Sequence, residues 1–222
     1  MGSINYLTHG TRPDMAYTIS RLGEGNKGPS PQYWELLKHL FRYIVGTFDL
    51  GIYIGGMGIT LLNLGLHAYA DAAFADRELT RHSTGGHIVF AAGAPLHWKT
   101  KRQTIVALSS TEAEFMNLTP TGMALIWVHN MLAEVGHKQK IPTLLYTDSQ
   151  NARHIALNPL QMARTRHIDL RYKWIIEKVT GGFFNLGHVG TADMAADGLT
   201  KPLQREKHRQ FVKQLGLYAP GT

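Results

Sequence analysis

Four isolated carboxylates are the residues of this chain best suited to chemistry. Asp71, Glu114, Asp148 and Asp197 each lie at the edge of an expected strand or helix, where a side chain can point into a shared site. The chain has 16 acidic residues against 23 lysines and arginines, so a cluster of four acids would be a clear local excess of negative charge. If their strands are neighbours and their helices pack over them, the four carboxylates converge.

Carboxylates in such a cluster are suited to hold divalent cations. Two cations about 4 Å apart can activate a water, bind a scissile phosphate and stabilise the leaving oxygen of phosphodiester hydrolysis. Oxygen ligands without His or Cys favour Mg²⁺ or Mn²⁺ over zinc. The chain has no cysteine, and its 12 histidines include no pair at i, i+4 spacing beside an acid. We therefore expect Mg²⁺, with Mn²⁺ as a possible substitute, and no zinc site.

Five strands are expected to position the acids. They cover residues 66–72, 86–91, 94–99, 141–147 and 183–189. Asp71 lies near the end of the first strand, and Asp148 directly follows the fourth. The second and third strands are joined through Gly93 and predict an antiparallel meander.

The helix that carries Glu114 has a clear start signal. Ser109 and Glu112 have the spacing of a capping box, in which the Ser side chain accepts a hydrogen bond from the helix N-terminus and the Glu reaches back. This gives Glu112 a structural role and leaves Glu114 free. Pro120 and Gly122 predict a kink near Thr119.

Three more helical stretches follow. One begins at about Ser149, one runs through Lys178, and one begins at Thr191 and presents Asp197 in its first turns. Three strands followed by alternating helices and strands indicate an α/β fold with a mixed sheet.

Residues 1–57 are expected to form a separate helical segment, and residues 58–222 the main domain. Gly55, Gly56 and Gly58 mark the candidate linker. Apolar residues at helical spacing predict a packing stripe made of Trp34, Leu37, Leu40, Phe41 and Ile44.

The net charge of +7 is concentrated at one end of the chain. Residues 151–222 have eleven basic and five acidic side chains, whereas the rest of the chain is nearly balanced. A basic surface near isolated acids suits a polyanion held close to a metal site. The sequence shows neither a membrane span nor a secretory signal, so we expect an intracellular protein without a membrane partner.

Six blocks of sequence, in order, carry a resemblance to a known family. They are 69–72 (YADA), 82–86 (HSTGG), 98–103 (WKTKRQ), 108–115 (LSSTEAEF), 166–172 (RHIDLRY) and 196–201 (ADGLTK). They resemble the ribonuclease H domain of copia-type retrotransposon reverse transcriptases, over nearly all of residues 64–205. Residues 2–7 (GSINYL), 11–14 (TRPD) and 40–47 (LFRYIVGT) resemble the segment that joins the polymerase to that domain.

The resemblance implies a ribonuclease H-like fold, with helices on both faces of a mixed five-stranded sheet. It implies that Asp71, Glu114, Asp148 and Asp197 bind two Mg²⁺ ions and are catalytic. The implied activity is hydrolysis of the RNA strand of RNA/DNA hybrids during reverse transcription. His188, in the stretch before the fourth acid, resembles a His thought to assist proton transfer or product release. The alternative is that His188 has only a structural role at the end of a strand.

The resemblance and the charge pattern also suggest residues that contact nucleic acid. These are Lys99, Lys101, Arg102, Ser109, Gln150, Asn151, Arg164, Arg166, His167 and Lys201. The implied partners are the hybrid and the polymerase domain of the same polyprotein, with homodimerisation left open. The implied location is the cytoplasm, a virus-like particle or the nucleus.

Two other classes of function remain to be weighed. A transposase or integrase core would need a late Glu after a second Asp, whereas the order here is Asp, Glu, Asp, Asp. A non-catalytic hybrid-binding or connection module would be marked by loss of a carboxylate, and all four are present. Ala73 and Lys173 depart from residues common in the family, but neither departure removes an expected ligand.

Overall fold

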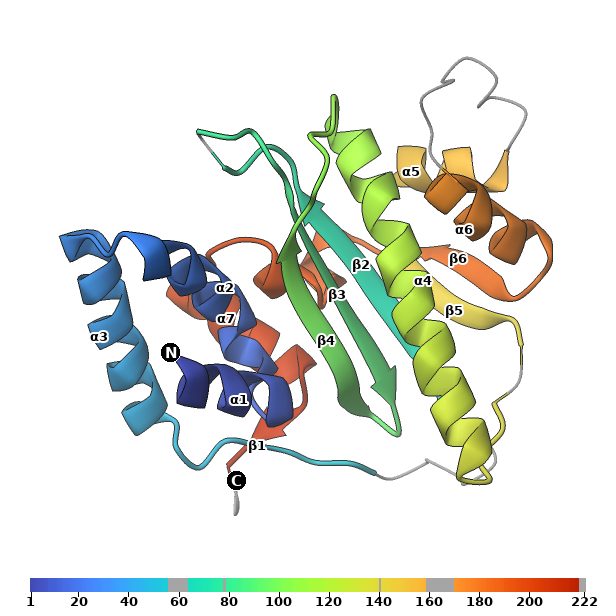
Figure 1. The fold of residues 1–222 in the computed structure, drawn as a ribbon. Helices are drawn as coiled ribbons and strands as arrows, with labels where there is room; N and C mark the ends of the chain where they lie inside the picture. The colour runs from blue at the N-terminus through green and yellow to red at the C-terminus, as the bar shows by residue number, and fades with distance from the viewer. Residues whose placement is uncertain (56–63, 78, 140, 159–169, 220–222) are drawn as a thin grey trace.

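The computed structural model describes residues 1–55, 64–77, 79–139, 141–158 and 170–219 (Figure 1). Its centre is a mixed sheet with strand order β4-β3-β2-β5-β6. The strands are β2 (His67–Ala73), β3 (Thr84–Ala91), β4 (Ala94–Arg102), β5 (Thr143–Thr147) and β6 (Phe184–His188). Neighbours are antiparallel from β4 to β2 and parallel from β2 to β6. The predicted α/β class and mixed five-stranded sheet are confirmed.

One face of the sheet is covered by three helices. They are α4 (Ser110–Glu134), α5 (Gln150–Leu157) and α6 (Leu170–Thr180). Alternate strand residues such as Ala68, Ala70 and Val89 pack with Leu118 and Leu125 of α4 in the larger core. Burial on this face follows the period of two expected for strands.

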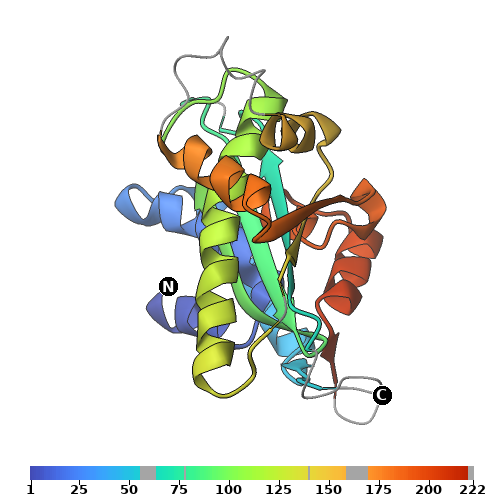
Figure 2. The same ribbon diagram turned by 90° about the vertical axis from the view of Figure 1, so that its right-hand side faces the viewer.

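The opposite face has a second core, built from both ends of the chain. Ile88 and Phe90 of β3 point to this side and pack with Ala16 of α2 (Ala16–Glu24) and Phe211 of α7 (Arg205–Gln214). Figure 2 shows α4 on one side of the sheet and α7 on the other. Helices on both faces, as predicted, are therefore present.

The N-terminal segment is helical, as predicted. It contains α1 (Gly2–Gly10), η1 (Pro13–Met15), α2, η2 (Gly25–Lys27) and α3 (Pro31–Gly46). The packing stripe predicted on α3 is correct only in part. Leu37, Leu40 and Ile44 pack against α1 and α2, but Trp34 is 61% and Phe41 is 51% exposed. The apolar surface of α3 is wider than its two neighbouring helices can cover.

The N-terminal helices contact the sheet directly. The indole Nε1 of Trp98 in β4 donates to the carbonyl oxygen of Thr8 in α1 at 2.9 Å. In addition, β1 (Gly51–Ile52) pairs antiparallel with β7 (Leu217–Tyr218), which joins the segment to the C-terminal end of the chain. Of the expected glycine linker, Gly55 is described and has a positive φ of 101°. Gly56, Gly58 and the expected boundary between residues 57 and 58 lie outside the described residues.

The kink expected near Thr119 does not divide α4, which is a single helix from Ser110 to Glu134 with Pro120 inside it. The hydroxyl of Thr121 donates to the carbonyl oxygen of Asn117 at 2.6 Å, next to the turn where Pro120 lacks an N–H.

The helix expected from Thr191 is wrong. Two short 3₁₀ turns occur instead, η4 (Thr191–Asp193) and η5 (Asp197–Leu199). Met194 between them has extended backbone angles and is buried. Pro202 follows closely and disfavours helical geometry in the residue before it. Asp197 therefore projects from a 3₁₀ turn held against the sheet.

In the described part of the chain, no helix combines the length and the apolar character needed to cross a membrane.

We predict that the Asp14→Asn variant is strongly destabilised. Asp14 forms a buried ion pair with Arg12 at 2.7 Å and accepts a hydrogen bond from the Tyr43 hydroxyl at 2.5 Å. Removing one charge leaves the buried guanidinium unpaired, which costs about 3–5 kcal/mol. Urea denaturation measures the free energy of unfolding.

The matched control is Glu35→Gln, which removes the exposed ion pair with Lys38. An exposed pair of this kind contributes about 0–1 kcal/mol. Equal losses of stability in the two variants would contradict the structural role of the buried pair.

Candidate active site

Asp71 is placed at the centre of the sheet. It lies near the end of β2 on the face opposite Ala70 and Ala72, and its partner across the antiparallel ladder is Gly86. Only 4% of the residue is exposed. The alternation of small apolar residues with Asp71 therefore buries a carboxylate among packed strands, which is costly unless the charge is compensated.

Glu114 is placed by the first turns of α4. Ser109 caps the helix by accepting from the Glu112 backbone N–H at 3.1 Å, and the Glu112 carboxylate accepts from the Leu108 N–H at 2.7 Å. The predicted capping role of Glu112 is confirmed, with its bond one residue earlier than the standard box. Glu114 is 8% exposed and lies against the sheet near Asp71.

Asp148 directly follows β5, which runs parallel to β2. Carboxylate oxygens of Asp71, Glu114 and Asp148 lie within 4.8 Å of one another. Strands β2 and β5 bring two of these acids together and α4 adds the third. The structure thus brings together three of the four acids singled out in the sequence.

Asp197 lies beside this group of three. Its charge raises the pKa of Asp71, and its own carboxylate is ion-paired with Lys201 one turn later. The Thr200 hydroxyl donates both to the Asp71 carboxylate and to the Asp197 carbonyl oxygen, the latter at 3.1 Å. The turn η5 is therefore tied to the end of β2.

Burial and mutual repulsion favour the binding of protons or cations by the acids of the cluster. Burial, followed by the charges of Asp71 and Asp148, raises the pKa of Glu114 to about 9. Burial also raises the pKa of Asp71 to about 6, against a lowering contribution from the Thr200 hydrogen bond. Burial acts to lower the pKa of Lys201, but its hydrogen bond to Asp197 and the nearby acids outweigh this and raise it.

The donor set fits Mg²⁺ or Mn²⁺. All candidate ligands are carboxylate oxygens, which hard divalent cations prefer. The Oε2 atom of Glu114 is buried and has no hydrogen-bond partner among the described residues. An unpartnered buried carboxylate oxygen facing two other acids is the environment that a bound cation would satisfy.

Two residues that hold the site together were not identified from the sequence. Asn117 is buried, and its side-chain amide donates to the carbonyl oxygens of Asp71 at 2.8 Å and Gly86 at 2.7 Å. Thr200 is fully buried beside Asp71. Asn117 lies three residues after Glu114, and Thr200 lies three residues after Asp197. This spacing of about one helical turn is the feature of the sequence that could have identified them as neighbours of the acids.

Gly86 allows the fourth acid to approach the sheet. A Cβ atom at this position would lie 2.8 Å from Leu199 Cβ and 3.3 Å from the Leu199 backbone carbon. The absence of a side chain on β3 opposite Asp71 therefore makes room for η5.

His188 lies at the exposed end of β6. Its ring Nε2 is 3.1 Å from the carbonyl oxygen of Asp148, and the Thr191 hydroxyl donates to the Asp148 carboxylate at 3.3 Å. The structure places His188 next to the cluster, and both a structural and a catalytic role remain compatible with this position.

The described residues among those predicted to bind nucleic acid fall into four places. Lys99, Lys101 and Arg102 are exposed on the edge strand β4, and Ser109 caps α4. Gln150 and Asn151 begin α5 and line a pocket with His188, while Lys201 lies beside the acids. Arg164, Arg166 and His167 lie outside the described residues.

The fold and the site together define an α/β domain with a buried carboxylate cluster that fits divalent metal. No family model matches the chain. It is 38% identical over 217 residues to the retrovirus-related Pol polyprotein from transposon RE2 of Arabidopsis thaliana. This match covers 98% of this chain and 15% of that protein. It is 34% identical over 219 residues to the Pol polyprotein from transposon TNT 1-94 of Nicotiana tabacum, covering 99% of this chain and 16% of that protein.

The chain belongs to the family of copia-type retrovirus-related Pol polyproteins. It spans 15–16% of the length of the two relatives named above. Among solved structures, ribonuclease H1 from Halobacterium salinarum NRC-1 is 20% identical over 61% of this chain and 93% of that one, with a TM-score of 0.36. A TM-score this low says nothing about the site.

We predict that Glu114 makes the metal-free protein less stable as pH rises. Its pKa in the folded state is raised from 4.5 to about 9, so between these values the folded state binds more protons than the unfolded state. The free energy of unfolding therefore falls with pH, by at most about 1.4 kcal/mol per pH unit from this group. In EDTA, Glu114→Gln should show a smaller loss than the parent between pH 6.5 and 8.5.

The control is Glu112→Gln, which keeps the cap and should retain the parent's pH dependence. At pH 8, Mg²⁺ should raise the melting temperature of the parent and of Glu112→Gln more than that of Glu114→Gln. Identical pH dependence in all three proteins would show that Glu114 does not lie in a charge-repelling site.

Proposed function

We propose that the chain is a divalent-metal-dependent endonuclease that hydrolyses the RNA strand of RNA/DNA hybrids during reverse transcription. The observation that carries the proposal is the convergence of buried Asp71, Glu114 and Asp148 within 4.8 Å, with Asp197 beside them. Membership of the Pol polyprotein family supports this activity over other uses of a carboxylate cluster.

In this proposal the four carboxylates hold two Mg²⁺ ions, for which Mn²⁺ can substitute. When bound, the metal supplies Lewis-acid activation of water and neutralises charge on the scissile phosphate. Thr200 orients the Asp71 carboxylate, and Asn117 fixes the backbone of β2 against β3. His188 is exposed next to Asp148, where an imidazole is suited to move a proton to the leaving oxygen near neutral pH.

Substrate binding is assigned to the basic edge of the sheet. Lys99, Lys101 and Arg102 are exposed on β4, and their positive charge can neutralise backbone phosphates. The amides of Gln150 and Asn151 lie on the other side of the acids, at the start of α5. A duplex that contacts both groups would cross the carboxylate cluster between them.

The second candidate is a non-catalytic hybrid-binding or connection module. A module that only binds the hybrid would not require three acids gathered within 4.8 Å, nor a buried glutamate oxygen without a partner among the described residues. We therefore favour the enzyme. We also propose that the chain acts within the cell beside the polymerase part of the same polyprotein, in the cytoplasm, a virus-like particle or the nucleus.

Asp148→Asn should abolish cleavage of a labelled RNA/DNA hybrid in Mg²⁺ while leaving folding intact. Asn keeps the volume of Asp and can still accept from the Thr191 hydroxyl, but it lacks the charge that holds metal. A gel assay with Mg²⁺ and with EDTA measures the effect.

Asp193→Asn is the control for this substitution, since Asp193 lies nearby in η4 but is exposed and outside the cluster of three. It should keep nearly full activity. Mg²⁺-dependent cleavage by Asp148→Asn would overturn the assignment of the metal ligands.

Hybrid affinity should fall steeply with salt, and Lys101→Ala/Arg102→Ala should flatten that dependence. Each lost phosphate contact lowers the slope of log K against log salt by about one. Binding is measured in the Asp148→Asn background, where no cleavage occurs. Lys27→Ala/Arg42→Ala removes two exposed charges from the N-terminal segment as a control. An equal change in both pairs would place the substrate elsewhere.

A further inference from the structure

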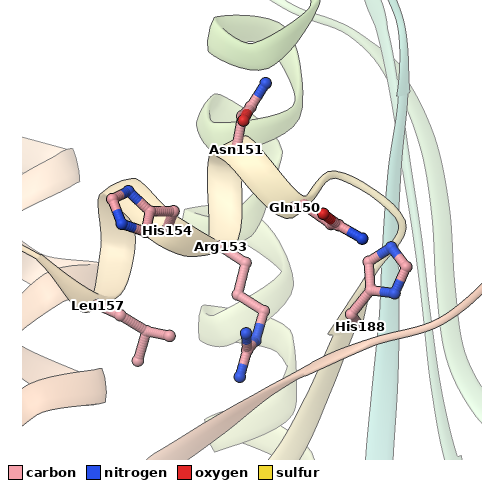
Figure 3. Close-up of a pocket in the computed structure, with 6 residues that line it drawn as sticks. All are labelled: Gln150, Asn151, Arg153, His154, Leu157 and His188. Atoms are coloured by element: carbon pink, nitrogen blue, oxygen red, sulfur yellow. The ribbon is translucent and has the colours of Figure 1, made fainter.

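A polar pocket adjoins the carboxylate cluster, between α5 and the end of β6. It has a volume of about 350 Å³, and Figure 3 shows the six residues that line it. They are Gln150, Asn151, Arg153, His154, Leu157 and His188. The Gln150 and His188 side chains point toward one another on one side, and His154 and Leu157 lie on the other. None of the six residues is acidic.

The helix turns its polar side to this pocket because its alanines face the core. Ala152 and Ala156 lie one turn apart and are fully buried in the larger core. Arg153, His154 and Leu157 occupy other faces of the same helix and remain at least partly accessible. The position of the basic residues is thus fixed by packing on the opposite side of α5.

Arg153 is held in place by one of its three nitrogens. Its Nε donates to the carbonyl oxygen of Leu186 in β6 at 2.7 Å. Within the described residues, its two terminal nitrogens have no hydrogen-bond or ion-pair partner. A guanidinium fixed through Nε, with the remaining donors free, is suited to bind an oxyanion.

The pocket shares a wall with the candidate active site. Gln150 follows Asp148 by two residues, and the ring Nε2 of His188 lies 3.1 Å from the Asp148 carbonyl oxygen. A polyanionic strand with one phosphate at the acids would therefore pass this wall and bring a further phosphate to the pocket that Arg153 and His154 help to line.

The chemistry of the lining residues indicates whether the pocket suits an apolar ligand, a cation or an anion. Leu157 is the only apolar residue among the six, so an apolar ligand would find little surface to contact. His154 and His188 are the only strong metal ligands, and a cation would also meet the charge of Arg153. One Arg, two imidazoles and two amides instead form a set of hydrogen-bond donors for an anion.

We propose that this pocket is a phosphate subsite in which Arg153, assisted by His154, binds a backbone phosphate of the strand that lies across the carboxylates. The assignment rests on the proposed function, because that function brings the strand to this wall. It adds Arg153 and His154 to the residues that position the substrate.

The test combines protein variants with hybrids in which single phosphates of the cut strand are replaced by uncharged methylphosphonates. Binding is measured in the Asp148→Asn background. In protein that keeps Arg153, a methylphosphonate at one position near the cut should weaken binding by about tenfold. Arg153→Gln should weaken binding to the unmodified hybrid by about the same factor. Combining the two changes should cause little further loss, because both remove the same contact. Arg153→Gln should also lower the salt slope by about one.

Arg42→Gln, an exposed change on the distant helix α3, serves as the control and should leave affinity unchanged. His154→Ala is a second variant, and it leaves the hydrogen bond from Arg153 to Leu186 intact. It should weaken binding to the unmodified hybrid and cause little further loss when the same phosphate is modified. Strictly additive losses for Arg153→Gln at every phosphate would overturn the subsite.

The proposed function is tested separately by cleavage with the parent protein. If the parent cleaves but the losses are additive, the subsite fails and the nuclease stands. If the parent does not cleave but the coupling is found, the subsite stands and the nuclease fails.

Discussion

The mutual repulsion of buried carboxylates is the constraint on which the rest of the structure depends. Asp71 and Glu114 lie in a region from which water is largely excluded, where two negative charges repel strongly. Burial is the largest cause of the raised pKa values of both groups, and the repulsion raises them further. Two packed cores, one on each face of the sheet, supply the stability that holds the acids together. A cation that fits between the acids would therefore offset their repulsion and stabilise the site.

Polar contacts convert this packing into a defined geometry. Asn117 joins the backbones of β2 and β3 beneath the acids, and Thr200 joins β2 to the turn that carries Asp197. These contacts link chain segments separated by 31 to 129 residues. The four acids are consequently positioned by three different layers of the structure, so rigidity at the centre of the sheet determines their spacing.

Local signals were sufficient to predict most of the elements. The alternation around Asp71 and the cap at Ser109 depend on neighbouring residues, and both are confirmed. Long-range packing determined what was missed. Asp197 lies in a 3₁₀ turn because Met194 and Leu199 are drawn into the second core. Trp34 is exposed although its spacing matched its buried neighbours on α3, because helical periodicity does not tell how much of a face will be covered.

Gly86 has a consequence for judging related copies of this sequence. It carries no functional group, yet it lies between Asp71 on the adjacent strand and the backbone of Leu199. A single methyl group here would press on η5 and move Asp197, which is 111 residues away along the chain. A related sequence that keeps all four acids can therefore still lose the geometry of the site at this glycine. The presence of the four acids alone is thus an incomplete guide to whether a related sequence keeps the site intact.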